Sequence, residues 1–393
     1  MDADSSAPDT ARLIPLDYRL RMPGPTTVPE RVRQAMALPI ISHRGPEFRR
    51  ILGDSTQMLR TIIGTQDDIF FLGTSGTGGM EAALANVLSP GDVILVIVCG
   101  QFGERFVNIA QGMGGSVDQA VVPWGEAPDT AFVAGHLKRR NYRAVVCVHN
   151  ESSTGVVTDI AAIGKSLSGT DTLLIVDSVS GLGGIDVRMD DWGVDILIAA
   201  SQKALMCPPG LAMVAVSRKA MAIIENASAI PRFYFDLRRA KASAKNNETA
   251  FTPPVSLIVA LHEALTMIHE EGLATVLLRH HRMSQALQMG CVALGLPMLP
   301  AEGVRSATVT VARVPEGLEG STIVRHMYSR YRTVIVSQRT KLQNRVIRFG
   351  TMGAIGPEDI FTDLRQLEET LRDLGQAVPT GAGVRAASAL IGA

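Results

Sequence analysis

The feature that most constrains the fold is a series of short, uninterrupted apolar runs that alternate with amphipathic stretches. These runs cover residues 93–98, 144–148, 173–176, 196–200 and 211–216. Each run is continuously apolar, whereas a strand with one face in water alternates apolar and polar residues. Both faces of these strands are therefore expected to be buried. The pattern predicts an α/β fold with a mostly parallel sheet between helices.

The chain is predicted to have four parts: an N-terminal arm (1–22), a large domain (23–272), a smaller α+β C-terminal domain (273–375) and a flexible tail (376–393). The arm is expected to be irregular, and the tail lacks a hydrophobic pattern, so it is expected to be loosely ordered. In the smaller domain, strand-like runs cover residues 307–312, 334–336 and 346–349.

Two helices are predicted at the borders of the large domain. Thr27 and Glu30 form a capping-box pattern, which predicts a helix that begins at Thr27. A second helical pattern extends from Val255 to about Glu271. This long helix is expected to connect the large domain to the smaller one.

Composition places the chain among ordinary globular proteins. Of its 393 residues, 46% are hydrophobic and 19% are charged, and the formal net charge is zero. No basic stripe is present, so no nucleic-acid partner is expected. No apolar stretch is long enough to span a membrane as a helix, so no membrane association is expected. The four scattered cysteines lack metal-site spacing, so no metal is expected. The acidic start without an apolar core favours a reduced, cytoplasmic protein.

Two polar residues stand at the ends of neighbouring apolar runs. Asp177 ends the run that begins at Leu173, and Lys203 closely follows residues 196–200. Ligands of α/β sheets bind where strands end. Pyridoxal phosphate requires a lysine that forms a Schiff base and a carboxylate that keeps the pyridine nitrogen protonated. Either residue alone is more often a surface or turn residue, but the pair together with a phosphate site favours this cofactor.

A glycine-rich turn upstream supplies a candidate phosphate site. Residues 73–79, Gly-Thr-Ser-Gly-Thr-Gly-Gly, lie between a strand-like run and a helix-like segment at residues 80–88. Backbone N–H groups at such a helix start favour a bound anion. The glycines match neither the P-loop nor the dinucleotide-binding pattern, so the turn alone does not identify its ligand.

Five segments, in this order, carry a resemblance to a known family: Ser75-Gly-Thr-Gly-Gly-Met-Glu-Ala-Ala-Leu84, Asn150-Glu-Ser-Ser-Thr-Gly155, Val176-Asp-Ser-Val179, Ser201-Gln-Lys-Ala-Leu-Met-Cys-Pro-Pro-Gly210 and Val346-Ile-Arg-Phe-Gly350. From about Pro23 to Gly375, the chain resembles the class V aminotransferases of pyridoxal phosphate fold type I. It is most similar to their alanine–glyoxylate and serine–glyoxylate (pyruvate) branch. The resemblance implies a seven-stranded, mostly parallel sheet in the large domain.

The resemblance assigns roles to the residues around the cofactor. Lys203 would form the Schiff base and, once displaced, move the proton from the substrate Cα, while Asp177 would pair with the pyridinium nitrogen. Phe102 would stack on the cofactor ring. The other implied cofactor-binding residues are Ser75, Gly76, Thr77 and Gln202 at the phosphate, Ser152 at the phenolic oxygen with Ser153 as its alternative, and Val179.

The resemblance also implies contacts with a second subunit and with the substrate. Thr249 and Thr252 resemble the segment that reaches the phosphate of a neighbouring subunit, which implies a homodimer with composite active sites. Arg348 would bind the substrate α-carboxylate, because a guanidinium pairs with a carboxylate through two hydrogen bonds. No second, distal arginine is evident, which favours small, uncharged side chains. The expected reaction moves an amino group from alanine or serine to glyoxylate or pyruvate by ping-pong half-reactions.

Several alternatives remain open. Transaminases of 2-aminoethylphosphonate or ureidoglycine, and lyases or desulfurases, would use the same lysine, aspartate and phosphate turn. A desulfurase needs a mobile reactive cysteine, whereas Cys291 lies in a helix-like apolar pattern. A non-catalytic binding protein or a nucleotide-binding enzyme would leave Lys203 and Asp177 unexplained. The polar cluster at His43 and Arg44 is not assigned to the site.

Overall fold

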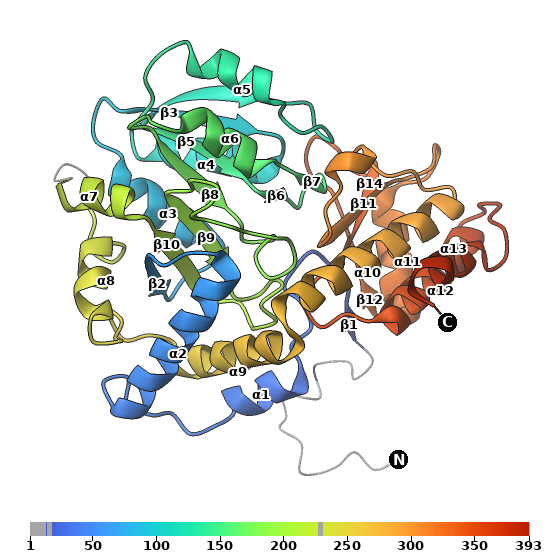
Figure 1. Ribbon diagram of the computed structural model, residues 1–393. Coiled ribbons are helices and arrows are strands. Elements are labelled where there is room, and N and C mark those ends of the chain that lie inside the picture. The colour runs from blue at the N-terminus through green and yellow to red at the C-terminus, as the bar shows by residue number, and fades with distance from the viewer. Residues whose placement is uncertain (1–12, 14–17, 227–230, 393) are drawn as a thin grey trace.

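The computed structural model describes Leu13, residues 18–226 and residues 231–392. A seven-stranded sheet forms the centre of the larger part of the molecule (Figure 1). The strand order is β2-β10-β9-β8-β5-β3-β4. In that order, the strands are β2 (Asp68–Leu72), β10 (Ala212–Val216), β9 (Ile196–Ala200), β8 (Leu173–Asp177), β5 (Ala144–Val148), β3 (Val93–Val98) and β4 (Ser116–Val121). All neighbours are parallel except β10, which is antiparallel to β2 and β9. The predicted mostly parallel α/β sheet is confirmed.

Helices cover both faces of this sheet and form a separate apolar core with each face, as continuously apolar strands require. One core includes side chains of α1 (Glu30–Met36), α2 (Pro46–Ile63), α5 (Thr130–Leu137), α6 (Ile160–Leu167) and α9 (Val255–Glu271). The opposite core includes side chains of α3 (Gly76–Val87), α4 (Gln101–Gly112), α7 (Arg218–Asn226) and α8 (Leu237–Ala244). A short hairpin, β6 (Asn150–Glu151) and β7 (Val156–Val157), follows β5.

A smaller α+β unit follows α9 and lies beside the large sheet (Figure 1). Its antiparallel sheet has the order β11-β14-β13, with β11 (Val309–Arg313), β14 (Val346–Gly350) and β13 (Val336–Ser337). Its other elements are α10 (Leu273–Ala293), η2 (Glu302–Val304), α11 (Gly320–Tyr331), β12 (Thr333–Val334), α12 (Pro357–Asp373) and α13 (Ala382–Ile391). The chain turns between α9 and α10 at Gly272, whose positive φ of 82° favours glycine. We place the proposed domain boundary there.

The predicted arm and tail both differ from expectation where the structure describes them. Arg19–Leu20 form strand β1, which pairs in parallel with β12, and Arg21 makes a buried ion pair with Asp363 at 2.7 Å. Residues 1–12 and 14–17 of the arm lie outside the described residues. In the tail, Ala382–Ile391 form the helix α13 rather than loose chain. Small residues allow α13 to pack closely on α10, since a Cβ at Gly290 would lie 3.0 Å from the carbonyl oxygen of Gly383.

The predicted capping box at Thr27 is wrong. Helix α1 begins at Glu30, its N-cap is Pro29, and no side chain caps it. The residue before a proline is disfavoured in the helical region, which prevents a helix that begins at Thr27 from passing through Val28 and Pro29. The second predicted helix is confirmed, because α9 spans Val255–Glu271.

No helix in the described parts of the chain is long and apolar enough to cross a membrane.

Candidate active site

Five strands end at the same edge of the large sheet and bring the predicted residues together. Strands β3, β5, β8 and β9 are parallel, and β2 has the same direction because β10 is antiparallel to both β2 and β9. The segments after these strands therefore meet at the edge where α/β sheets bind ligands. They carry Ser75, Gly76 and Thr77 after β2, Phe102 after β3, Ser152 after β5, Asp177 and Val179 at the end of β8, and Gln202 and Lys203 after β9.

Lys203 lies in a buried position against the segment at Pro23 and Gly24. The residue is 9% exposed, and its Nζ donates a hydrogen bond to the carbonyl oxygen of Pro23. Gly24 has a φ of +96°, and a Cβ there would lie 2.5–2.8 Å from three side-chain atoms of Lys203. Burial lowers the pKa of Lys203 to about 8, although the Asp177 carboxylate opposes this shift. A substantial fraction of the side chain is therefore a neutral amine near pH 8.

Asp177 provides the carboxylate expected beside a pyridine nitrogen. It is 3% exposed, and its Oδ1 accepts a hydrogen bond from the Val179 N–H at 2.7 Å. Burial raises the pKa of Asp177 to about 6, while the Val179 hydrogen bond and the charge of Lys203 oppose this shift. Asp177 is therefore mostly ionised at pH 7. Its second oxygen, Oδ2, accepts no hydrogen bond from the residues that the structure describes, so it is free to accept a bond from a ring N–H.

The segment after β2 has donors and space for a phosphate. Ser75 is the N-cap of α3, and its side chain makes no capping hydrogen bond. The first N–H groups of a helix lack intrahelical acceptors and can donate to an anion. A Cβ at Gly76 would lie 2.9 Å from Cγ2 of Val179, so glycine allows α3 to begin close to the segment that follows β8. The hydroxyl of Thr77 accepts a hydrogen bond from Arg105 at 3.0 Å.

Two charged residues that the sequence analysis did not assign complete this part of the site. Glu151 is fully buried, and one carboxylate oxygen accepts hydrogen bonds from the N–H groups of Phe102 and Gly103 at 2.9 and 3.2 Å. The Arg105 guanidinium lies over the Phe102 ring, 4.5 Å from its centre. Together they hold Phe102 at the start of α4. Their only sequence signal was proximity, since Glu151 precedes Ser152 and Arg105 is about one helical turn after Phe102.

Arg348 enters the site from β14 of the smaller unit. Its Nη1 donates a hydrogen bond to the carbonyl oxygen of Ser152 at 2.9 Å, and its Nε is buried without a partner among the described residues. Burial lowers the pKa of Arg348 to about 10, the Glu151 carboxylate opposes this shift, and the Arg339 charge adds to it. Arg348 remains charged at neutral pH. Its unpaired N–H can donate to a carboxylate.

The two candidate serines differ in their surroundings. The Ser153 hydroxyl donates a hydrogen bond to Glu151 and accepts one from the Gln101 N–H, so it is already engaged. The Ser152 hydroxyl makes no hydrogen bond with the described residues, although this serine is buried. Ser152 is therefore the better placed of the two to contact a ligand, and its contact with the cofactor stays a prediction.

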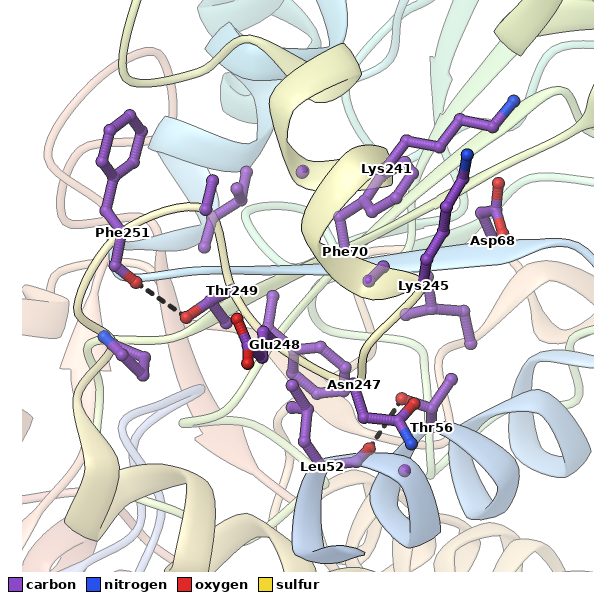
Figure 2. A pocket seen from close by; sticks show the side chains of 18 of the residues that line it. Leu52, Thr56, Asp68, Phe70, Lys241, Lys245, Asn247, Glu248, Thr249 and Phe251 are labelled. Carbon is purple, nitrogen blue, oxygen red and sulfur yellow. Dashed lines mark hydrogen bonds between the residues drawn. The ribbon is translucent and has the colours of Figure 1, made fainter. Parts of the chain in front are cut away.

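Thr249 and Thr252 lie in the loop that precedes α9. They line a cavity of about 260 Å³ between α2, β2, α8 and the loop that precedes α9 (Figure 2). The Thr249 hydroxyl donates a hydrogen bond to the carbonyl oxygen of Phe251 at 2.7 Å. No other residue predicted to bind the cofactor lines this cavity. Gly73, the first residue of the glycine-rich turn, lines the same cavity, and the contact of the two threonines with a cofactor stays a prediction.

The residues at the sheet edge fit pyridoxal phosphate. Among the described residues, Gln202 Oε1 and Arg348 Nε are buried without a hydrogen-bond partner. Asp177 Oδ2 and the Ser152 hydroxyl, on two buried residues, also make no hydrogen bond within the described part of the chain. A phosphate, a pyridine nitrogen, a phenolic oxygen and a substrate carboxylate would supply partners for such groups at Ser75, Asp177, Ser152 and Arg348. In the same described part of the chain, no group of three or more His, Cys, Asp or Glu residues could hold a metal ion.

The pKa of Lys203 leads to a prediction for cofactor capture. Only the neutral amine attacks an aldehyde, and the neutral fraction rises about tenfold per pH unit below the pKa. With a pKa of about 8, the cofactor-free protein should bind pyridoxal phosphate covalently about tenfold more slowly at pH 7 than at pH 9. Stopped-flow absorbance at a series of pH values measures this rate. A rate that still increases about tenfold between pH 8 and pH 9 would show that Lys203 has the pKa of an exposed lysine, about 10.4.

Comparison with known proteins gives consistent matches over most of the chain. Residues 22–318 match the family model described as aminotransferase class-V. The chain is 38% identical to the soluble hydrogenase 42 kDa subunit of Anabaena cylindrica, covering 94% of this chain and 97% of that protein. It is 37% identical to the L-aspartate–glyoxylate aminotransferase of Paracoccus denitrificans, covering 93% and 94%.

A solved structure gives a similar result. The alanine–glyoxylate aminotransferase of a Nostoc species superimposes with a TM-score of 0.88 at 30% sequence identity. The superposition covers 93% of this chain and all of that protein, 100% of its length. The similarity therefore includes both the large sheet and the smaller unit.

Proposed function

This chain belongs to the class V aminotransferase family, and from this premise we propose that it transfers the amino group of a small amino acid, alanine or serine, to glyoxylate or pyruvate. The cofactor would be pyridoxal phosphate, and donor and acceptor would react in turn at one site. The observation that carries the proposal is the buried pair of Lys203 and Asp177 at the ends of two adjacent parallel strands. The names of the aminotransferase relatives support glyoxylate as the acceptor.

When bound, pyridoxal phosphate supplies an aldehyde that takes up the amino group and a ring that stores the electrons of the broken Cα–H bond. We propose that Ser75, Gly76 and Thr77 bind its phosphate together with Gln202 and the helix start of α3. Asp177, ionised at neutral pH, would hold the ring nitrogen in its protonated form. Phe102, fixed by the hydrogen bond from its N–H to Glu151, would stack on the ring.

Lys203 would hold the cofactor at rest and move a proton during the reaction. Its pKa of about 8 lies close to neutral pH, which suits a group that must both accept and return a proton. Arg348 would orient the substrate by its α-carboxylate so that the Cα–H faces Lys203. Burial of Lys203 and Asp177 excludes water from the pair and strengthens the interaction between their charges.

We further infer a homodimer with composite sites, in which Thr249 and Thr252 reach the phosphate bound by the other subunit. Lys203 does not line the cavity of these threonines, whereas the exposed Tyr234 does, which supports a contact with a second copy of the chain there. A cytoplasmic location is also part of the proposal. All four cysteines are buried and unpaired, as expected for a reduced protein.

Desulfurase chemistry receives no support from Cys291. This residue lies within α10 and is fully buried, and burial raises the pKa of its thiol to about 12. A reactive cysteine needs a low pKa and access to substrate. Cys291 therefore has neither property.

The proposal is tested by following the two half-reactions separately. Addition of alanine or serine to the holoenzyme should convert the absorbance of the aldehyde form to that of the amine form, and glyoxylate or pyruvate should restore it. Glycine or alanine should appear in stoichiometric amount. If the Lys203-dependent absorbance is present but neither amino acid changes it, the donor assignment is wrong, and 2-aminoethylphosphonate and ureidoglycine become the next donors to test.

A further inference from the structure

One arginine joins two segments that are proposed to hold the cofactor. Arg105 lies on α4, and its Nη1 donates a hydrogen bond at 3.0 Å to the hydroxyl of Thr77, in the first turn of α3. Its guanidinium also lies over the Phe102 ring, 4.5 Å from the ring centre. The second contact follows from the sequence spacing, because residues three apart are neighbours on a helix. Arg105 therefore connects the phosphate turn to the ring that is proposed to stack on the cofactor.

The contact with Arg105 determines how the Thr77 hydroxyl can bond to a ligand. A threonine hydroxyl has one hydrogen to donate and two lone pairs that accept, whereas a guanidinium can only donate. The Thr77 hydroxyl therefore accepts from Arg105, and among the described residues it donates to none. Its hydrogen remains available for a phosphate at the start of α3, where the first helix N–H groups also lack intrahelical acceptors.

Arg105 also supplies positive charge beside the phosphate turn. A phosphate monoester carries about −1.5 to −2 charges near pH 7, and residues 73–79 include no lysine or arginine. Burial is the main cause of the lowered pKa of Lys203 and of the raised pKa of Asp177, and the Arg105 charge lowers the pKa of both residues. Lys203 is proposed to attach the cofactor and Arg348 to bind the substrate. Arg105 is therefore the cation of this group that still lacks a role.

We propose that Arg105 is a positioning residue for the cofactor phosphate: it holds the Thr77 hydroxyl as a hydrogen-bond donor to the phosphate, so that the protein selects the phosphorylated cofactor over pyridoxal. This inference rests on the proposed function, because it requires pyridoxal phosphate at Lys203. Pyridoxal has the same ring and the same aldehyde but no phosphate. It keeps the proposed contacts with Phe102, Asp177 and Lys203 and lacks those that depend on Arg105 and Thr77.

The test measures the affinity of the cofactor-free protein for pyridoxal phosphate and for pyridoxal by absorbance titration. Arg105→Met removes the charge and the N–H donors but keeps an unbranched apolar side chain against Phe102. It should weaken the binding of pyridoxal phosphate about 10- to 100-fold, the range for one lost hydrogen bond to a charged group. Pyridoxal binding should fall by less than about threefold, because only the indirect contact through the Phe102 ring is lost. Arg105→Lys should recover part of the affinity for pyridoxal phosphate.

A double-mutant cycle tests whether Arg105 acts through Thr77. Thr77→Val removes the hydroxyl at nearly constant volume and should also weaken pyridoxal phosphate more than pyridoxal. The variant with both substitutions, Arg105→Met and Thr77→Val, should lose no more affinity than the weaker-binding single variant, since the effects of interacting residues do not add. Arg140→Met, which removes the same charge from a side chain that is 52% exposed, should leave both affinities unchanged.

Two results would overturn the inference. Equal losses for pyridoxal phosphate and pyridoxal in Arg105→Met would show that Arg105 supports only Phe102 or the fold. Fully additive losses in the double variant would show that Arg105 does not act through Thr77. If the wild-type protein binds pyridoxal as tightly as pyridoxal phosphate, the phosphate site of the proposed function fails instead, so the two failures are distinguishable.

Discussion

Replacing Lys203 with alanine is expected to abolish covalent attachment of the cofactor and to slow transamination by at least about 10²- to 10⁴-fold, the contribution typical of a single acid–base group. Lys203 is the lysine at the end of β9, and its pKa of about 8 suits both attachment and proton transfer. The absorbance of the bound cofactor and single-turnover rates with alanine would measure the two effects separately.

A matched lysine provides the control for this prediction. Lys165 lies on α6 and is exposed, so Lys165→Ala should keep both the cofactor absorbance and the rate of the wild-type enzyme. Cofactor-free Lys203→Ala should still fold, because the substitution removes a partly charged side chain from a buried position. A cooperative thermal unfolding transition would show that the variant is folded. Retention of the covalent cofactor absorbance in Lys203→Ala would show that a different lysine binds the cofactor.

The residues that could be predicted from the sequence share one property. Lys203 and Asp177 are polar residues that end continuously apolar runs, and a chain-local pattern is enough to place them at strand ends. Parallel pairing then brings the strand ends together, as Asp177 opposite Ile198 in β8 and β9 shows. The glycine-rich turn and Phe102 could be found for the same reason, since each follows a strand directly.

The residues that could not be predicted depend on contacts between distant segments. Gly24 contacts Lys203 across about 180 residues of sequence, and the hydrogen bond from Lys203 to Pro23 spans the same interval. Glu151 accepts hydrogen bonds from N–H groups at the start of α4, and no hydrophobic periodicity in the sequence predicts that contact. Such contacts depend on tertiary packing, which a local sequence pattern does not encode.

The two errors at the chain ends have a related cause. The Arg19–Leu20 strand is too short to produce a pattern, and it forms because β12 offers a free edge and Asp363 a buried partner for Arg21. Residues 382–391 have no polar stripe or cap, yet their alanines favour a helix and their small side chains fit closely on α10. In both segments, the conformation depends on packing against the rest of the fold more than on the local sequence.

Replacing Asp177 with asparagine is expected to change two measurements in opposite directions. The asparagine oxygen can still accept the hydrogen bond from the Val179 N–H, so the local structure should be retained. Transamination should fall by about 10²- to 10³-fold, as is typical when one preorganised electrostatic partner of the reacting group is lost. The cofactor-free variant, however, should capture pyridoxal phosphate faster than the wild type at pH 7.

The faster capture follows from the sign of the interaction between the two side chains. The Asp177 carboxylate raises the pKa of Lys203, against the larger lowering by burial. Without that negative charge, the pKa of Lys203 falls below about 8, and more of the amine is neutral at pH 7. The pH profile of capture should therefore shift to lower pH, while Asp171→Asn, at an exposed position two residues before the same strand, should leave it unchanged. A variant that loses activity without this shift would place Asp177 too far from Lys203 for the charges to interact, and the two residues would not form one site.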